Sequence, residues 1–138
     1  MKSFLALAAF AGAALAQSAQ IGLPTVGQKL HKGRDVVVQV QRPNTITGST
    51  EMAVAIGISS CASDVCQESD EVMGTILYNG KFHPQYHEYY LPPYQNFSVK
   101  VPADFTAGTA QINVAHATLI GAGPFPFLEA LNRTVVIV

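Results

Sequence analysis

The amino-acid sequence predicts an all-β fold: a single immunoglobulin-like antiparallel β-sandwich of about seven strands after a cleaved signal peptide. Short segments rich in β-branched residues alternate with glycine, proline and asparagine turn signals along most of the chain. No segment within residues 17–138 keeps apolar residues at helical spacing without a glycine or proline. The chain lacks tryptophan, and its two cysteines are close together, so it is not a true immunoglobulin domain. A small Greek-key barrel is the competing architecture.

The first sixteen residues have the three parts of a secretory signal peptide. Lys2 gives a positive start, residues 4–15 form an apolar run, and residues 14–16 have the small-x-small form of a signal-peptidase site. The run is too short to cross a bilayer as a helix, which needs about 20 residues. A membrane anchor or a buried N-terminal helix is the alternative. We predict a signal peptide over residues 1–16 and one β-sandwich domain over residues 17–138.

Seven segments of the predicted domain have the composition of strands. Each is bounded by turn signals and is rich in β-branched residues or alternates apolar with polar or small ones. In chain order they are 21–23, 35–41, 51–60, 72–78, 96–101, 109–120 and 132–138. The expected connections include a basic turn at 28–32, a tight turn at Asn79-Gly80 and a Gly/Pro-rich loop at 121–127.

The predicted mature chain has a small net charge. Removal of Lys2 lowers the eight basic residues to seven, against nine acidic residues, so the formal charge is near −2. Nucleic acid is not an expected partner, because phosphate binding requires many lysine and arginine contacts. No second long apolar segment follows the signal peptide, so we expect no stable membrane insertion. A soluble, secreted monomer is the resulting prediction.

Cys61 and Cys66 are expected to form a disulfide, because secreted proteins fold in an oxidising compartment. A lone C-x4-C pair is only a weak zinc signal. Glycosylation sequons begin at Asn96 and Asn132. A glycan on Asn96 must point outward, which agrees with the alternating apolar residues that follow it. A glycan on Asn132 turns Arg133 inward, so either Arg133 reaches solvent or this sequon is unused.

The segment 82–101 holds four of the five tyrosines of the chain. The pair Pro92-Pro93 excludes a central strand in its first part, so we expect an ordered aromatic loop that leads into a core strand. Aromatic side chains on rigid loops are good binding anchors. The alternative is that these rings fold back and cap the end of the sandwich. The predicted partner-binding residues are Tyr86, Tyr89, Tyr90, Phe125 and Phe127.

Catalytic and metal chemistry have less support in the sequence. His83, His87 and Glu88 could act as zinc or copper ligands or as an acid–base group, but loop histidines that bond to the backbone are the simpler interpretation. No G-x-S-x-G nucleophile motif is present. His116 lies on the inward face of the longest predicted strand and is interpreted as a core histidine with hydrogen-bond partners. We expect neither an enzyme nor a cofactor.

Five segments resemble the necrosis-inducing secreted protein family of fungal effectors: IGLPTVGQKLHKG, MAVAIGIS, VPADFTAGTAQINVAH, GAGPFPF and LNRTVVIV. The resemblance covers most of the mature chain. It implies a small, secreted, non-enzymatic protein that provokes plant cell death and suppresses immune signalling. The implied partners are receptor-associated kinases of the host plant, with action in the host cytoplasm after uptake as an open possibility. For residues 121–138, the resemblance implies partner contact.

A carbohydrate- or cell-wall-binding module is the alternative function. In that case the exposed tyrosine and phenylalanine rings would stack on sugars rather than contact a protein.

Overall fold

The computed structural model describes residues 18–45 and 47–138, so the predicted signal peptide lies outside the described residues. In the described part the chain forms eight strands and one short 3-10 turn, Ala62–Asp64, and has no α-helix. No helix there is long and apolar enough to cross a membrane. The prediction of an all-β domain is therefore confirmed.

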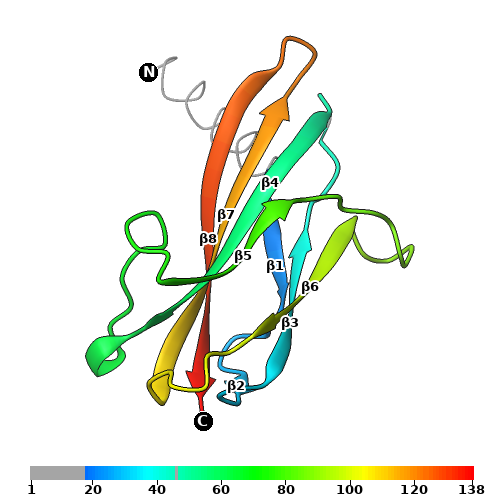
Figure 1. Ribbon diagram of the computed structural model, residues 1–138. Coiled ribbons are helices and arrows are strands. Elements are labelled where there is room, and N and C mark those ends of the chain that lie inside the picture. Colours follow the sequence, from blue (N-terminus) through cyan, green and yellow to red (C-terminus); the bar gives the residue numbers. More distant parts are fainter. Residues whose placement is uncertain (1–17, 46) are drawn as a thin grey trace, which may run out of the picture.

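The strands form two sheets, which face each other in Figure 1. The smaller sheet has the order β1-β3-β6, from Gln20–Leu23, Asp35–Gln41 and Tyr94–Lys100. The larger sheet has the order β2-β8-β7-β4-β5, from Lys29–Leu30, Phe125–Ile137, Gly108–Ile120, Ser49–Ser60 and Thr75–Lys81. The long strands β4, β7 and β8 extend past the end of the smaller sheet (Figure 1).

The hydrophobic core lies between the sheets and draws on both. Val38 and Val40 of β3 and Phe97 of β6 are buried against Val54 of β4 and Val114 of β7. Alternate residues of each strand point to the same face, so the period-two apolar pattern selects these side chains for the interior. Two packed sheets with one shared core are consistent with a sandwich, whereas the immunoglobulin-like topology stays a prediction.

The strand count is eight rather than seven because the predicted basic turn at 28–32 contains β2. Lys29 and Leu30 pair in parallel with Val136 and Ile137 of β8. Leu30 is almost fully buried, so this short strand closes one side of the core. The prediction of a wholly antiparallel fold is therefore wrong at this pair, because two residues give too short a pattern to identify a strand.

Two predicted turns are also wrong. Asn79 and Gly80 lie inside β5, where they pair with Ala55 and Val54 of β4, so they do not form a tight turn. The strand β8 begins at Phe125, so only residues 121–124 of the predicted Gly/Pro-rich loop form the turn. In both cases pairing with a long neighbouring strand outweighs the local turn preference.

The two sequons lie on strands with their asparagine side chains exposed. On β6, Asn96 is exposed while Phe97 and Val99 are buried, as the alternation predicts. On β8, Arg133 does point inward, and its guanidinium donates a hydrogen bond to the backbone carbonyl of Ile21. An exposed Asn132 and an inward Arg133 are thus compatible, because the arginine has a polar partner on β1. Glycosylation itself stays a prediction.

Candidate functional site

The aromatic loop, residues 82–93, connects β5 to β6 and is fixed at both ends. Phe82 is fully buried and packs edge to face with the His116 ring, with ring centroids 5.5 Å apart. Gln85 and Tyr94 exchange two backbone hydrogen bonds of 3.1 and 2.9 Å. The backbone N–H of His83 donates to the side-chain oxygen of Gln95 at 2.8 Å. These contacts hold the start of the loop against the edge of β6.

The middle of the loop packs on the buried ring of Tyr94. His87 stacks on this ring with centroids 4.1 Å apart and an interplanar angle of 20°. The Tyr94 hydroxyl donates to both carboxylate oxygens of Glu88, at 3.0 and 2.9 Å. This hydrogen bond to a carboxylate raises the pKa of Tyr94. His87 and Glu88 therefore fix the middle of the loop to one tyrosine, Tyr94.

His83, His87 and Glu88, the residues considered as possible metal ligands, are not gathered into one metal-binding group. In residues 18–45 and 47–138, no cluster of three or more histidine, cysteine, aspartate or glutamate side chains is arranged to hold a metal ion. The interpretation of the loop histidines as side chains that bond to the backbone does not describe His87, whose ring stacks on that of Tyr94.

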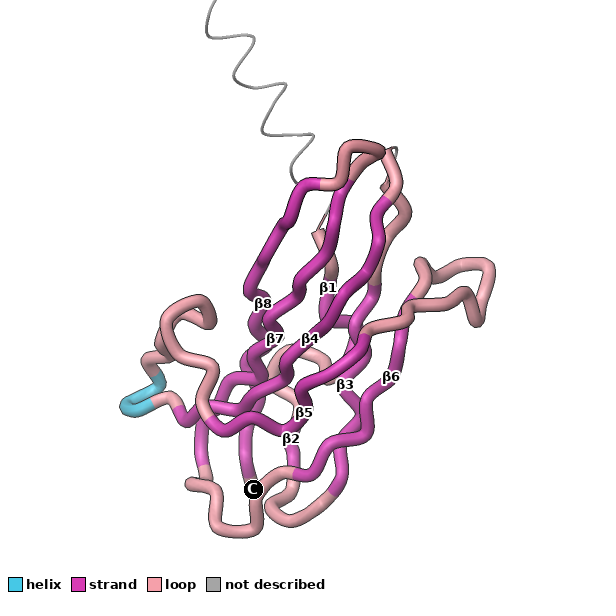
Figure 2. The backbone as a smooth tube through the Cα atoms, turned by 45° about the horizontal axis from the view of Figure 1, so that its top comes forward, coloured by secondary structure: helices cyan, strands magenta, loops and turns pink. Residues whose placement is uncertain are grey.

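Three tyrosines of the loop face solvent. Tyr86, Tyr89 and Tyr90 are 62%, 98% and 70% exposed. Tyr89 and Tyr90 contact each other edge to face, with centroids 5.4 Å apart, and the Tyr86 hydroxyl accepts a hydrogen bond from Asn44. Figures 1 and 2 show the loop projecting from the side of the molecule. Of the four tyrosines, only Tyr94 folds back onto the protein.

Phe125 and Phe127 belong to β8 rather than to a loop. Their register partners on β7 are Ile120 and Thr118, so both rings point to the inward face of the larger sheet. Phe125 is exposed and Phe127 is half-buried. Leu128, on the opposite face, is 73% exposed. The sequence pattern does not identify it, because residues 128–131 lie between the predicted loop and the predicted last strand.

The five predicted contact residues therefore form two separate surfaces. The first is the aromatic loop with its three exposed tyrosines, and the second is the end of the β7–β8 hairpin. Figures 1 and 2 show that these two regions project in different directions.

An open groove of about 800 Å³ lies between the start of the aromatic loop and the segment that joins β3 to β4. Its walls combine apolar rings with charged and neutral polar groups. The residues that line it include Arg42, Pro43, Asn44, Ser49, Glu51, Phe82, Pro84, Gln85 and Pro93. Tyr86 lies beside the groove through its hydrogen bond with Asn44. The polar lining fits a hydrogen-bonding ligand better than a purely apolar one.

Two residues of the groove belong to a buried charge cluster formed by Arg42, Glu51, His116 and Glu129. The Nε of Arg42 lies 2.8 Å from Oε1 of Glu51. The two ring nitrogens of His116 face different carboxylates, Nε2 towards Glu51 and Nδ1 towards Glu129 at 2.9 Å. Glu129 also accepts a hydrogen bond of 2.6 Å from the backbone N–H of Ala19. The cluster thus links β4, β7 and β8 to the chain beside β1 and β3.

The electrostatics of the cluster favour charged partners. Burial alone would raise the pKa of Glu51, but hydrogen bonds from His116, Arg42 and Ser49 outweigh it and lower the pKa to about 2. Burial alone would lower the pKa of His116, but hydrogen bonds to Glu129 and Glu51 outweigh it and raise the pKa above 6.5. Because His116 is fully buried, the cluster has a structural role. The interpretation of His116 as a satisfied core histidine is confirmed.

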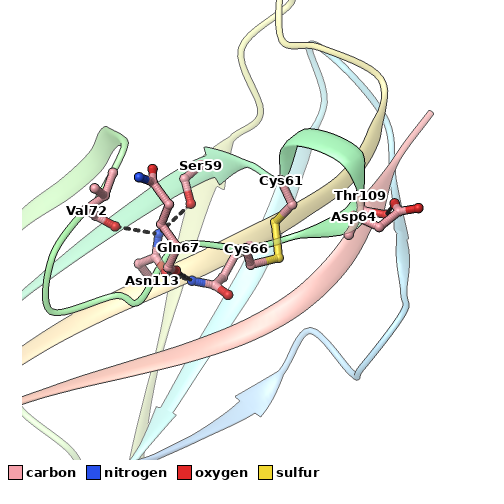
Figure 3. Close-up of a disulfide and its surroundings, with 9 residues drawn as sticks. Ser59, Cys61, Asp64, Cys66, Gln67, Val72, Thr109 and Asn113 are labelled. Carbon is pink, nitrogen blue, oxygen red and sulfur yellow. Dashed lines mark hydrogen bonds between the residues drawn. A yellow bond between two sulfur atoms is a disulfide. The ribbon is translucent and has the colours of Figure 1, made fainter.

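The disulfide loop, residues 61–74, is attached to the outer face of the larger sheet. Cys61 and Cys66 form the predicted disulfide. Asn113 of β7 is fully buried and donates to the Ser59 hydroxyl and to the backbone carbonyls of Val72 and Met73. Figure 3 shows Ser59 and Val72 with Asn113 beside the disulfide. Gln111 donates to the backbone carbonyl of Gln67 at 2.8 Å. Side chains of β7 thus supply the hydrogen bonds that the loop backbone requires.

Comparison with known proteins identifies one family. A family model described as the Nis1 family matches residues 14–136, which is nearly the whole chain. No curated protein matches the chain.

Proposed function

The chain belongs to the Nis1 family of necrosis-inducing effectors, and we propose that it is a secreted fungal effector that acts by binding a host plant protein. The family name implies secretion. The proposed partner is a receptor-associated kinase of the plant, and the proposed consequences are cell death and suppressed immune signalling. Binding to the cytoplasmic domain of such a kinase requires uptake into the host cell.

The exposure of Tyr89 on a fixed loop is the observation that best supports a binding role. Its ring is 98% exposed, and its neighbour Tyr90 is exposed beside it. Tyrosine supplies a large contact area with only two side-chain torsions, so its burial by a partner costs little conformational entropy. The contacts of Phe82, Gln85 and Tyr94 hold the loop in place before a partner binds.

The direct test compares three forms of the secreted protein. The wild type, a triple variant with Tyr86→Ala, Tyr89→Ala and Tyr90→Ala, and a control with Val26→Ala are measured for binding to plant receptor-associated kinase domains and for cell death in leaves. Val26 is 72% exposed and lies outside both candidate surfaces. We expect the triple variant to bind at least about tenfold more weakly, because aromatic anchors contribute about 1–2 kcal/mol or more. The control should bind as the wild type does.

A second set of variants locates the contact surface. Phe125→Ala and Leu128→Ala remove exposed side chains at the end of the β7–β8 hairpin, which belongs to the region that the resemblance associates with partner contact. Weaker binding by these variants, with full binding by the triple tyrosine variant, would move the contact surface to the hairpin. Failure of the wild-type protein to bind any kinase domain would contradict the proposed partner class.

Carbohydrate binding is the second candidate, and the position of the exposed Tyr86 beside a polar groove favours it. Tyrosine rings stack on sugar rings, while groove residues such as Asn44 and Gln85 can bond to hydroxyl groups. A pull-down with chitin and glucan tests this candidate. Retention on either polysaccharide that Tyr89→Ala abolishes would favour the carbohydrate-binding module over the effector that binds a protein.

A further inference from the structure

Among the described residues, three strands have long open edges: β5, β6 and β8. β5 ends the larger sheet and pairs only with β4. In the described part of the chain, β6 pairs as a strand only with β3 over Tyr94–Lys100, and its other side has only the isolated bridge between Tyr94 and Gln85. β8 lies inside the larger sheet, but β2 covers only Val136 and Ile137. Among the residues that the structure describes, the stretch 125–133 of β8 therefore pairs only with β7. Open edges of this kind are templates for the addition of another strand.

The hydrogen bonds at one end of β6 show which of its backbone groups face the open side. Tyr94 bonds with Gln85 on the side away from β3. Backbone groups alternate in direction along an antiparallel strand, and the register with β3 is unbroken. The N–H and C=O groups of Asn96, Ser98 and Lys100 therefore face the open side as well.

The same reasoning applies to β8. The carbonyl of Thr134 accepts a hydrogen bond of 2.8 Å from Gly27, and the N–H of Val136 donates to Gln28, so both face away from β7. The register with β7 is unbroken along the strand. Four further residues share this orientation: Pro126, Leu128, Ala130 and Asn132. Pro126 has no N–H group, and an N–H at this position would face the open side of β8. The strand therefore loses no ladder hydrogen bond at Pro126.

Both sequons coincide with these open edges. Asn96 and Asn132 are exposed, each lies on an open strand, and each has its backbone directed to the open side. We propose that both asparagines carry N-linked oligosaccharides and that these glycans block strand addition at the open edges of β6 and β8. In each modification, the side-chain nitrogen bonds to the anomeric carbon of a lipid-pyrophosphate-linked oligosaccharide. The lipid pyrophosphate leaves, and the amide loses one proton.

A glycan is effective at these positions because of the spacing between paired strands. A second strand must approach to about 4.8 Å along the hydrogen-bonding direction. A bulky, hydrated oligosaccharide beside the edge prevents that approach. Other protection is local: Lys100 places a charge at one end of β6, and Pro126 removes one donor from β8. Between Pro126 and Asn132, the open-side residues Leu128 and Ala130 provide no charge.

The first experiment measures occupancy. The full chain is secreted from a yeast host, and its intact mass and glycopeptides are analysed before and after endoglycosidase H treatment. We expect two occupied sites, with the loss of one in Asn96→Gln and of the other in Asn132→Gln. An unmodified asparagine at either position overturns the proposal for that strand.

The second experiment measures association. Endoglycosidase H trims the folded protein, and sedimentation velocity then compares trimmed and untreated samples. We expect the trimmed protein to self-associate with an association constant raised at least tenfold. A trimmed protein that stays monomeric at the same concentrations overturns the protective role. Because trimming follows folding, this result does not depend on whether a sequon variant folds.

A matched pair of substitutions tests the edge directly. One variant combines Ser98→Ala with Asn132→Gln, and the other combines Ser98→Pro with Asn132→Gln. Both variants lack both sequons, but only the proline variant also lacks the N–H of residue 98, which faces the open side of β6. We expect the alanine form to associate through β6 more strongly than the proline form. Equal association of the two forms contradicts strand addition at this edge.

Discussion

Glu51→Gln tests the role of the buried charge cluster. Glu51 lies at the start of β4 and accepts hydrogen bonds from Arg42, His116 and Ser49. Glutamine has nearly the same shape but no charge, so the ion pair of Arg42 with Glu51 is lost, and His116 loses one of its two carboxylate partners. Both cationic side chains are at least 97% buried in the wild type, and removal of one partner from a buried ion pair is strongly destabilising.

The lowered pKa of Glu51 sets the magnitude. Its pKa is about 2 in the folded protein, compared with 4.5 for an unperturbed glutamate. Each tenfold change in proton affinity corresponds to about 1.4 kcal/mol, so the ionised carboxylate stabilises the fold by about 3 kcal/mol at neutral pH. The unfolded state binds the proton more tightly, so this stability is present above pH 4.5 and is lost as the pH falls towards 2. We expect Glu51→Gln to cost about 3 kcal/mol at pH 7.

Urea unfolding followed by circular dichroism measures this effect at pH 7 and between pH 2 and pH 5. The control is Glu71→Gln, which removes an exposed carboxylate from the disulfide loop. The wild type and the control should lose stability as the pH falls through the acidic range, and Glu51→Gln should lose much less. A cost below about 1 kcal/mol at pH 7, or an unchanged pH dependence in Glu51→Gln, would refute the reasoning.

Three further predictions follow from other contacts. The pKa of His116 is raised above 6.5 in the folded protein, so its contribution to stability is fully present below pH 6.5 and is lost as the pH rises through the folded pKa. The urea midpoint of the wild type should therefore fall as the pH rises above 6.5, and that of His116→Gln should not. Gly57→Ala should lower the stability measured by thermal unfolding by about 2 kcal/mol, because the new Cβ would lie 2.2 Å from the Met73 carbonyl oxygen. The control Gly123→Ala should change stability by less than about 0.5 kcal/mol, because nothing lies within 4 Å of the new Cβ. Cys61→Ser should lower stability by only about 2 kcal/mol, because the disulfide closes a short loop, and an unfolded variant would contradict this.

Local patterns in the sequence predicted the parts of the fold that depend on neighbouring residues. Alternation placed Phe97 and Val99 inside and Asn96 outside, and the structure agrees. The presence of two cysteines in a chain predicted to be secreted predicted their disulfide. The density of tyrosines and prolines before β6 predicted a projecting loop, and three of its tyrosines are exposed. Each of these features is specified within a few residues of the chain.

Pairing between distant segments decided the remaining features. A two-residue strand such as β2 has no pattern of its own, and only its bonds to the end of β8 define it. Pro126 indicates a loop when it is considered alone, but the register of β8 gives it a position where no N–H is required. The same register turns Phe125 and Phe127 inward and leaves Leu128 exposed.

The sequence by itself therefore determined the all-β fold class, the faces of the long strands and the aromatic loop, because these follow from periodicity and from local turn chemistry. It also determined the disulfide, which follows from the predicted secretion of a chain with two cysteines. Only the tertiary structure decided the partners of His116, which lie 65 and 13 residues away along the chain. It also decided which strand edges stay open and that both sequons lie on them. A single strand has the same local pattern whether its edge is paired or open, so that information exists only once the sheets are assembled.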